Sequence, residues 1–176
     1  SDLFKKHIAY PPLRPFVGGC ILVLAFWFLP LLKYEGLGVP VIVDAFTNTS
    51  EWQYFLLKIL LTTFTLGAGF KGGEVTPLFF IGATLGSALS MTVPLPMALL
   101  AGMGFVAVFS GATHTPIACT VMGLELFGIE CGIFVGLACI IAYFASGSVG
   151  IYESQIVKGP KFHLYKKLSK NELKNL

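Results

Sequence analysis

Two long stretches without charge constrain this chain more than any other feature. No Asp, Glu, Lys or Arg lies between Glu74 and Glu125, and none occurs from Cys131 through Tyr152. A helix needs about 20 predominantly apolar residues to cross a bilayer, and charges are costly there. Hydrophobic residues make up 55% of the chain and charged residues only 12%, too few to cover a soluble domain. The sequence therefore predicts a multi-pass protein of the cell membrane.

The two ends of the chain carry most of the remaining information about topology. The chain begins without an initiator Met or signal peptide, since its first apolar run follows Lys5, Lys6 and Arg14. We interpret it as the back part of a longer polypeptide. The net charge of +3 sits largely in a basic tail, residues 158–174, and is no nucleic-acid signal. Such a tail fits the positive-inside rule and predicts a cytoplasmic C-terminus, although a solubilising role is compatible with it.

Glycine and proline divide the apolar sequence into short helices. The expected helices cover residues 15–32, 51–70, 74–91, 97–109, 115–127 and 129–145, and a last helix begins at Ile151. Ser50 or Thr49 is a plausible cap for the second of these helices. The predicted fold class is an all-α membrane protein with tilted and broken transmembrane helices. Residues 1–150 form its transmembrane region, part of a larger transporter, and residues 151–176 a final helix and basic cytoplasmic tail.

Several of these helices are too short to span a bilayer comfortably. Breaks are expected at Gly67–Gly73, Ser110–Gly111 and Ser146–Gly150. Freed backbone groups cannot face lipid, so breaks are tolerated only where they are buried in protein or line a watery cavity. This pattern is typical of broken-helix transporters, whose ion sites lie at helix ends near the middle of the membrane.

The segment Gly72–Pro77, with the sequence Gly-Gly-Glu-Val-Thr-Pro, has the chemistry of an anion site. A helix N-terminus offers free N–H groups and the positive end of the helix dipole. Pro77 suits the first turn of such a helix, and glycines let backbone N–H groups approach a ligand. Thr76 or Glu74 could cap the helix. Because an ionised carboxylate within a bilayer is expensive, we favour a functional, proton-linked Glu74 over a mere cap.

Three aromatic residues are further candidates for anion binding. Phe79 and Phe80 follow one turn into the expected helix, and the positive edge of an aromatic ring can meet a small anion. With 16 Phe in the chain, ordinary packing is the stronger alternative for either ring. Tyr152 follows the second glycine break, and its phenol can solvate an anion without carrying charge. An interfacial tyrosine is an equally good interpretation of the residue.

Small residues recur at helical spacing and permit close packing of helices in lipid. For Gly82 and Gly86 the pattern favours packing within the chain. For Gly128, Gly132 and Gly136 it leaves internal packing and a subunit interface open.

The sequence offers no support for an enzyme. It contains no Walker motif, nucleophile triad or metal-ligand cluster, and no cofactor or metal is expected. His114 and Glu125 are interpreted as structural polar residues near helix ends.

The order of these motifs resembles the C-terminal half of the CLC family of chloride channels and anion/proton antiporters. Residues 71–83 resemble the family segment Gly-Gly-Ile-Phe-x-Pro-x-Leu-x-x-Gly. Residues 101–105, followed by Pro116 and Leu124-Glu125, resemble its Ala-Gly-Met-Gly, Ala-Pro-Leu and Leu-Glu pattern, and Tyr152 falls at its anion-coordinating tyrosine. The resemblance implies the second half of an inverted-repeat CLC-type fold. It also implies a homodimer whose interface uses residues 115–127 and 129–145, and a gating glutamate in an N-terminal half.

One departure from the family pattern is informative. Glu74-Val75 replaces the usual Ile-Phe, and Glu-Val-Thr-Pro is similar to the fluoride/proton antiporter branch of the family. The resemblance implies fluoride-handling roles for Glu74, Val75 and Tyr152, with Phe79 and Phe80 as weaker candidates. The expected ligands are fluoride or chloride ions and protons. The alternatives are a chloride-selective channel or chloride/proton exchanger and, from another class, a non-conducting membrane assembly subunit, against which a buried Glu74 argues.

Overall fold

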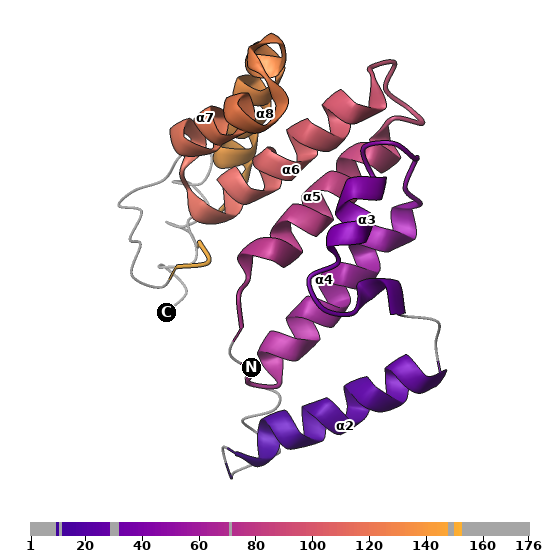
Figure 1. The fold of residues 1–176 in the computed structure, drawn as a ribbon. Coiled ribbons are helices and arrows are strands. Elements are labelled where there is room, and N and C mark those ends of the chain that lie inside the picture. The colour runs from indigo at the N-terminus through magenta and orange to yellow at the C-terminus, as the bar shows by residue number, and fades with distance from the viewer. Residues whose placement is uncertain (1–9, 11, 29–31, 71, 148–149, 153–176) are drawn as a thin grey trace, which may run out of the picture. The chain divides into compact units, whose positions relative to one another are not determined.

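The computed structural model describes residues 10, 12–28, 32–70, 72–147 and 150–152. The chain divides into two compact units, residues 1–105 and residues 106–176, and each is described by itself. All regular secondary structure in the described ranges is helical, which confirms the predicted all-α class (Figure 1). The last helix is predicted to begin at Ile151, but Ile151 and Tyr152 are not helical; residues 153–176, which hold the rest of the predicted helix and the basic tail, lie outside the described residues.

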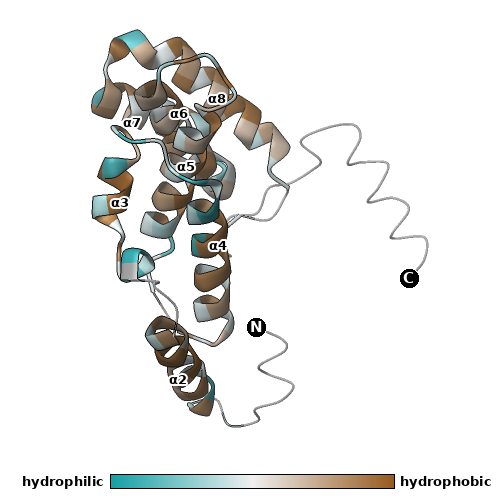
Figure 2. Cartoon of the chain, turned by 90° about the vertical axis from the view of Figure 1, so that its right-hand side faces the viewer, coloured by the Kyte–Doolittle hydropathy of each residue, from teal (hydrophilic) through white to brown (hydrophobic). Residues whose placement is uncertain are grey.

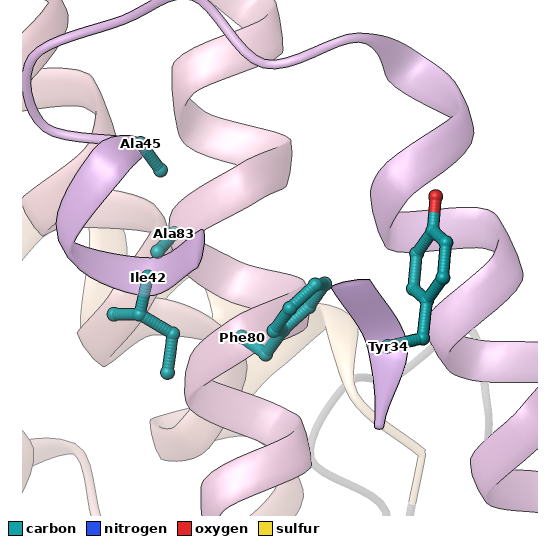
Figure 3. Close-up of a cluster of buried hydrophobic side chains, with 5 residues drawn as sticks. All are labelled: Tyr34, Ile42, Ala45, Phe80 and Ala83. Atoms are coloured by element: carbon teal, nitrogen blue, oxygen red, sulfur yellow. The ribbon is translucent and has the colours of Figure 1, made fainter. Parts of the chain in front are cut away.

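The first unit is built around a pair of neighbouring helices. Its elements are α2 (Leu13–Phe28), η1 (Leu32–Tyr34), α3 (Val39–Asp44), α4 (Trp52–Gly67), α5 (Val75–Leu89) and the start of α6 (Met97–Thr113). Helices α4 and α5 lie side by side in Figure 1. Five buried side chains form the core beside them (Figure 3), namely Tyr34, Ile42, Ala45, Phe80 and Ala83. Helix α2 is predominantly hydrophobic (Figure 2), and Trp27 on it is 83% exposed.

Close backbone packing joins α5 to the first half of α6. Gly82 lies against the carbonyl of Gly104, and Gly86 lies against that of Leu100. A Cβ atom at either position would collide with backbone, which cannot move out of the way as a flexible side chain can. The predicted internal packing of this glycine pair is therefore confirmed.

The loop before α4 is tied to α5 by a buried hydroxyl. Ser87 Oγ accepts a hydrogen bond from the Ser50 N–H at 3.0 Å and donates one to the Asn48 carbonyl at 3.1 Å. The predicted cap at Ser50 or Thr49 is wrong. Glu51 occupies the N-cap position of α4, without a side-chain cap hydrogen bond, because Ser50 is buried against α5 instead.

The second unit contains the end of α6, then α7 (Pro116–Phe127), η2 (Ile129–Cys131) and α8 (Gly132–Ala145). Gly123 lies 2.5 Å, measured from the Cβ it would carry, from a methyl group of Val135. Gly132 and Gly136 lie against side chains of α7, so two members of the predicted glycine ridge pack within the chain. Gly128 has a φ of 90° and open space around it.

The predicted helix break at Ser110–Gly111 is wrong, because α6 continues to Thr113. The Ser110 hydroxyl donates to the Cys139 carbonyl at 3.0 Å, and Gly111 lies close to the Ala142 carbonyl. Both small residues serve packing against α8. The chain turns instead at His114, which is buried and has a φ of 57°.

The predicted short helices are confirmed by α2 and α4 to α8, which are 12 to 17 residues long. None of the helices within the described ranges meets the length and hydropathy expected of a bilayer-crossing span. The third expected helix is shorter at both ends than predicted, and so is the second, which begins at Trp52 and ends at Gly67. The sixth begins with the 3₁₀ turn η2.

Candidate functional site

The N-terminus of α5 presents the free backbone N–H groups that the sequence predicts. The first backbone hydrogen bond of this helix runs from the Leu78 N–H to the Glu74 carbonyl at 3.3 Å. The N–H groups of Val75 and Thr76 precede it and have no partner within the helix, and Pro77 has no N–H to satisfy. Two donors and the positive end of the helix dipole therefore meet at one point.

Glu74 occupies the N-cap position of α5 with a φ of −89° and a ψ of −16°. Neither Glu74 nor Thr76 supplies the predicted side-chain cap, because the helix start has no side-chain cap hydrogen bond. The Glu74 side chain is partly buried, and Gly72 and Gly73 before it are exposed with open space around them. The Glu74 carboxylate is therefore at the N-terminus of α5 but does not cap it.

The two phenylalanines of α5 have different surroundings. Phe79 stacks on Phe105 with ring centroids 4.1 Å apart and planes 4° apart. Phe80 is fully buried, 6.1 Å from the Tyr34 ring, and the Lys58 ammonium lies 4.9 Å from its centroid. Both rings thus have packing partners within the first unit, as expected if they serve ordinary packing and not anion binding.

A cavity of about 290 Å³ lies beside the N-terminus of α5. We call it the Lys58 cavity. Its walls come from α2, the segment after η1, α4 and the glycine segment before α5. It is lined by Leu22, Phe26, Tyr34, Glu35, Gly36, Lys58, Leu61, Thr62, Thr65, Leu66, Phe70, Gly72, Gly73 and Pro77. Three residues of the predicted anion segment, Gly72, Gly73 and Pro77, therefore border the same cavity as a buried lysine.

Lys58 is the functional candidate that the sequence argument did not select. It lies in the middle of α4, is 4% exposed, and donates to the carbonyls of Tyr34 at 2.9 Å and Gly36 at 3.1 Å. Within the described residues its ammonium forms no ion pair with a carboxylate. The available signal was its position as the one charge inside the apolar helix after Glu51.

Tyr152 belongs to the second unit and is described with that unit alone. Its side chain is 48% exposed. The preceding Ile151 N–H donates to the Ala112 carbonyl at 3.0 Å, and Gly150 lies close to the ring of His114. The chain after α8 is thereby fixed to the end of α6, which positions the backbone just before Tyr152.

Short helices broken at glycines, with a helix N-terminus beside a partly buried carboxylate, are the pattern of broken-helix membrane proteins. Residues 1–147 match the model of the voltage gated chloride channel family, so the chain belongs to that family of membrane proteins. This finding agrees with the resemblance seen in the sequence.

The relatives agree with the family assignment. The chain is 49% identical, over 165 residues, to a chloride/fluoride channel protein of Pseudomonas syringae pv. tomato (strain ATCC BAA-871 / DC3000), covering 90% of this chain and 36% of that protein. It is 29% identical to the voltage-gated ClC-type chloride channel ClcB of Escherichia coli (strain SMS-3-5), covering 84% of this chain and 38% of that protein.

A solved structure supports the fold directly. The crystal structure of a CLC-type fluoride/proton antiporter superposes with a TM-score of 0.80 at 40% sequence identity, covering 86% of this chain and 39% of that one. The predicted CLC-type fold is therefore confirmed. The chain spans little more than a third of the length of these relatives.

Proposed function

We propose that the complete protein to which this chain belongs exports fluoride across the cell membrane in exchange for protons. The observation that carries the proposal is Glu74, a carboxylate at the N-cap of α5 that makes no cap hydrogen bond and lies next in sequence to two N–H groups without a partner inside the helix. The relatives whose names mention fluoride are also the more similar ones, at 49% and 40% identity against 29% for the ClcB channel.

The start of α5 supplies one wall of the proposed ion site. Backbone N–H groups bind the anion, and Glu74 alternates between protonated and ionised forms as protons move in the opposite direction. Tyr152 is a further proposed ligand of the anion, through its phenol hydroxyl. The proposed anion-binding residues are Gly72, Gly73, Glu74, Val75, Thr76 and Tyr152, with Phe79 and Phe80 as weaker candidates because both rings have packing partners.

The remaining parts of the transporter are proposed from the same reasoning. An N-terminal half of the same polypeptide completes the pathway, and two complete polypeptides form a homodimer. Residues 1–150 contribute the transmembrane region, and residues 151–176 form a final helix and a cytoplasmic basic tail. The protein acts as an ion transporter and not as an enzyme.

Ion efflux from liposomes containing the complete protein tests this function. Fluoride flux at least about a hundred times the chloride flux, with proton movement in the opposite direction, is the expected result; this ratio corresponds to a selectivity of about 2.7 kcal/mol. Chloride flux equal to or greater than fluoride flux would contradict the proposal.

A chloride channel or chloride/proton exchanger is the second candidate. The family description and the ClcB relative favour it, since both name chloride. The same efflux measurement separates the two, and proton movement separates an exchanger from a channel.

A further inference from the structure

The Lys58 cavity carries an inference that goes beyond the residues at the start of α5. Lys58 is buried at 4% exposure in the middle of an apolar helix. An uncompensated buried cation is costly, so such a group needs an anionic partner or a set of strong acceptors. The structure supplies carbonyl acceptors, but within the described residues the Lys58 ammonium forms no ion pair with a carboxylate.

The ammonium has capacity beyond its observed contacts. Of its three N–H donors, two are used by the Tyr34 and Gly36 carbonyls, at 2.9 and 3.1 Å. The Phe80 ring, with its centroid 4.9 Å away, contributes a cation–π contact on a further side. These contacts fix the position of the ammonium without neutralising its charge.

The cavity has the size for a small hydrated anion. Its volume of about 290 Å³ exceeds the roughly 30 Å³ that one water occupies in the liquid, so an ion and several waters fit. Thr62 and Thr65 contribute hydroxyl groups to the wall, although the Thr65 hydroxyl already donates to the Leu61 carbonyl at 2.7 Å. The opposing charge in the lining is Glu35, which is exposed, so water weakens its effect on the cavity without removing it.

We propose that the Lys58 cavity is an anion-binding vestibule in which the Lys58 ammonium holds a small inorganic anion next to the Gly72–Pro77 segment. The inference rests on the proposed function, because the anion in the cavity is taken to be the transported ion. A fixed positive charge in a partly enclosed space concentrates anions, which raises the occupancy of the neighbouring site at low concentration. Lys58 also positions the loop after η1 through its two carbonyl contacts.

The test separates anion binding from loop positioning. In the complete protein in liposomes, flux is measured against the concentration of potassium fluoride and of potassium chloride. Lys58→Met should raise the half-saturating concentration of the transported anion about tenfold, as expected for loss of a charge-assisted contact, with maximal flux changed less than twofold. Lys58→Arg, which keeps the charge, should restore half-saturation to within about threefold of the wild type.

Lys33→Met is the matched control. Lys33 is exposed, and its ammonium donates to the Tyr54 hydroxyl at 3.0 Å, so its loss removes one charge near the same loop outside the cavity. Half-saturation should stay unchanged in this variant. Glu35→Gln should shift half-saturation downward about twofold, because it removes the opposing charge, and this second arm remains informative if Lys58→Met does not fold.

Three results would overturn the proposal. One is an unchanged half-saturation in Lys58→Met, which would leave Lys58 as a clamp on the loop or as the partner of a carboxylate elsewhere in the protein. Another is a shift of equal size in Lys33→Met. The third is failure of Glu35→Gln to lower half-saturation.

If the wild type carries chloride and not fluoride, the proposed function fails, and the same variants are judged on chloride. If the wild type carries neither ion, anion binding is measured by calorimetric titration of the wild type and of Lys58→Met with both salts. Equal binding by the two proteins would contradict the proposed anion site at Lys58.

Discussion

Glu74 and Glu51 are the same residue type in the same local position. Each is the N-cap of its helix, α5 or α4, and neither makes a side-chain cap hydrogen bond. Their surroundings differ, because Glu51 is exposed and Glu74 is partly buried next to the glycine segment. This pair gives a matched comparison for the role of the carboxylate in transport.

Glu74→Gln should reduce fluoride flux by about tenfold or more and flatten its dependence on pH. The amide cannot take up and release a proton, so a coupled exchange loses its carrier. Liposome efflux at several pH values measures both effects. Glu51→Gln removes an equal charge from a helix N-cap and should leave flux and pH dependence unchanged. Equal effects of the two substitutions would assign Glu74 a merely local electrostatic role.

Ser87→Ala should destabilise the protein by about 1–2 kcal/mol. The hydroxyl accepts from the Ser50 N–H and donates to the Asn48 carbonyl, and its removal leaves a buried N–H without a partner. Thermal unfolding of the detergent-solubilised protein measures the loss. Ser90→Ala is the control, because in the described part of the chain Ser90 Oγ bonds within its own turn, to the Ser87 carbonyl at 2.7 Å. A loss in Ser90→Ala as large as in Ser87→Ala would contradict the explanation.

The start of α5 shows how far sequence reasoning reaches at the level of a single site. The glycines, the carboxylate and Pro77 are adjacent in sequence, so their meeting at a helix N-terminus could be predicted from local rules alone. Lys58 could not be placed in the same way. Its partners Tyr34 and Gly36 are 24 and 22 residues away, and only the folded chain brings their carbonyls to the ammonium.

Among the elements, α6 explains why some predictions of helix ends failed. Ser110-Gly111 has the composition of a break, but both residues are small and lie where α6 packs on α8. In a membrane-type helix the same residues that interrupt a soluble helix permit close approach of a neighbour. Composition alone does not tell a helix break from a close contact between helices. Gly82 and Gly86 could be assigned to a contact because their spacing of four residues places them on one helix face.

Gly82→Ala and Gly86→Ala should each destabilise the protein by about 2 kcal/mol or more. The added methyl group meets a backbone carbonyl of α6 in both cases, so the helices have to separate. Thermal unfolding in detergent is again the measurement. Gly147→Ala is the control, because a Cβ there meets nothing within 4 Å. Destabilisation of the control by a similar amount would show that lost backbone freedom, and not helix contact, is responsible.

At the scale of the whole molecule, apolar surface on the second unit requires a partner or lipid. On α7 and α8, Ile117 is 80% exposed, Ile133 is 77% exposed and Ile141 is 66% exposed. Gly132 and Gly136 are directed toward α7, so the exposed residues and not the glycines remain available for an outside contact. The proposed homodimer places its interface on these two helices.

Ile133→Trp should weaken the dimer of the complete protein by about tenfold or more in dissociation constant, equivalent to about 1.4 kcal/mol. A bulky ring disrupts a close-packed protein interface, but it is tolerated by fluid lipid, so it separates the two ways of covering the same surface. Single-molecule photobleaching of labelled protein at increasing dilution in liposomes measures the dimer fraction. Val23→Trp, at a residue of α2 that is 66% exposed, is the matched control and should leave that fraction unchanged. If Ile133→Trp dimerises as the wild type does, the exposed face of α8 is covered by lipid, and the homodimer has to be built from another surface.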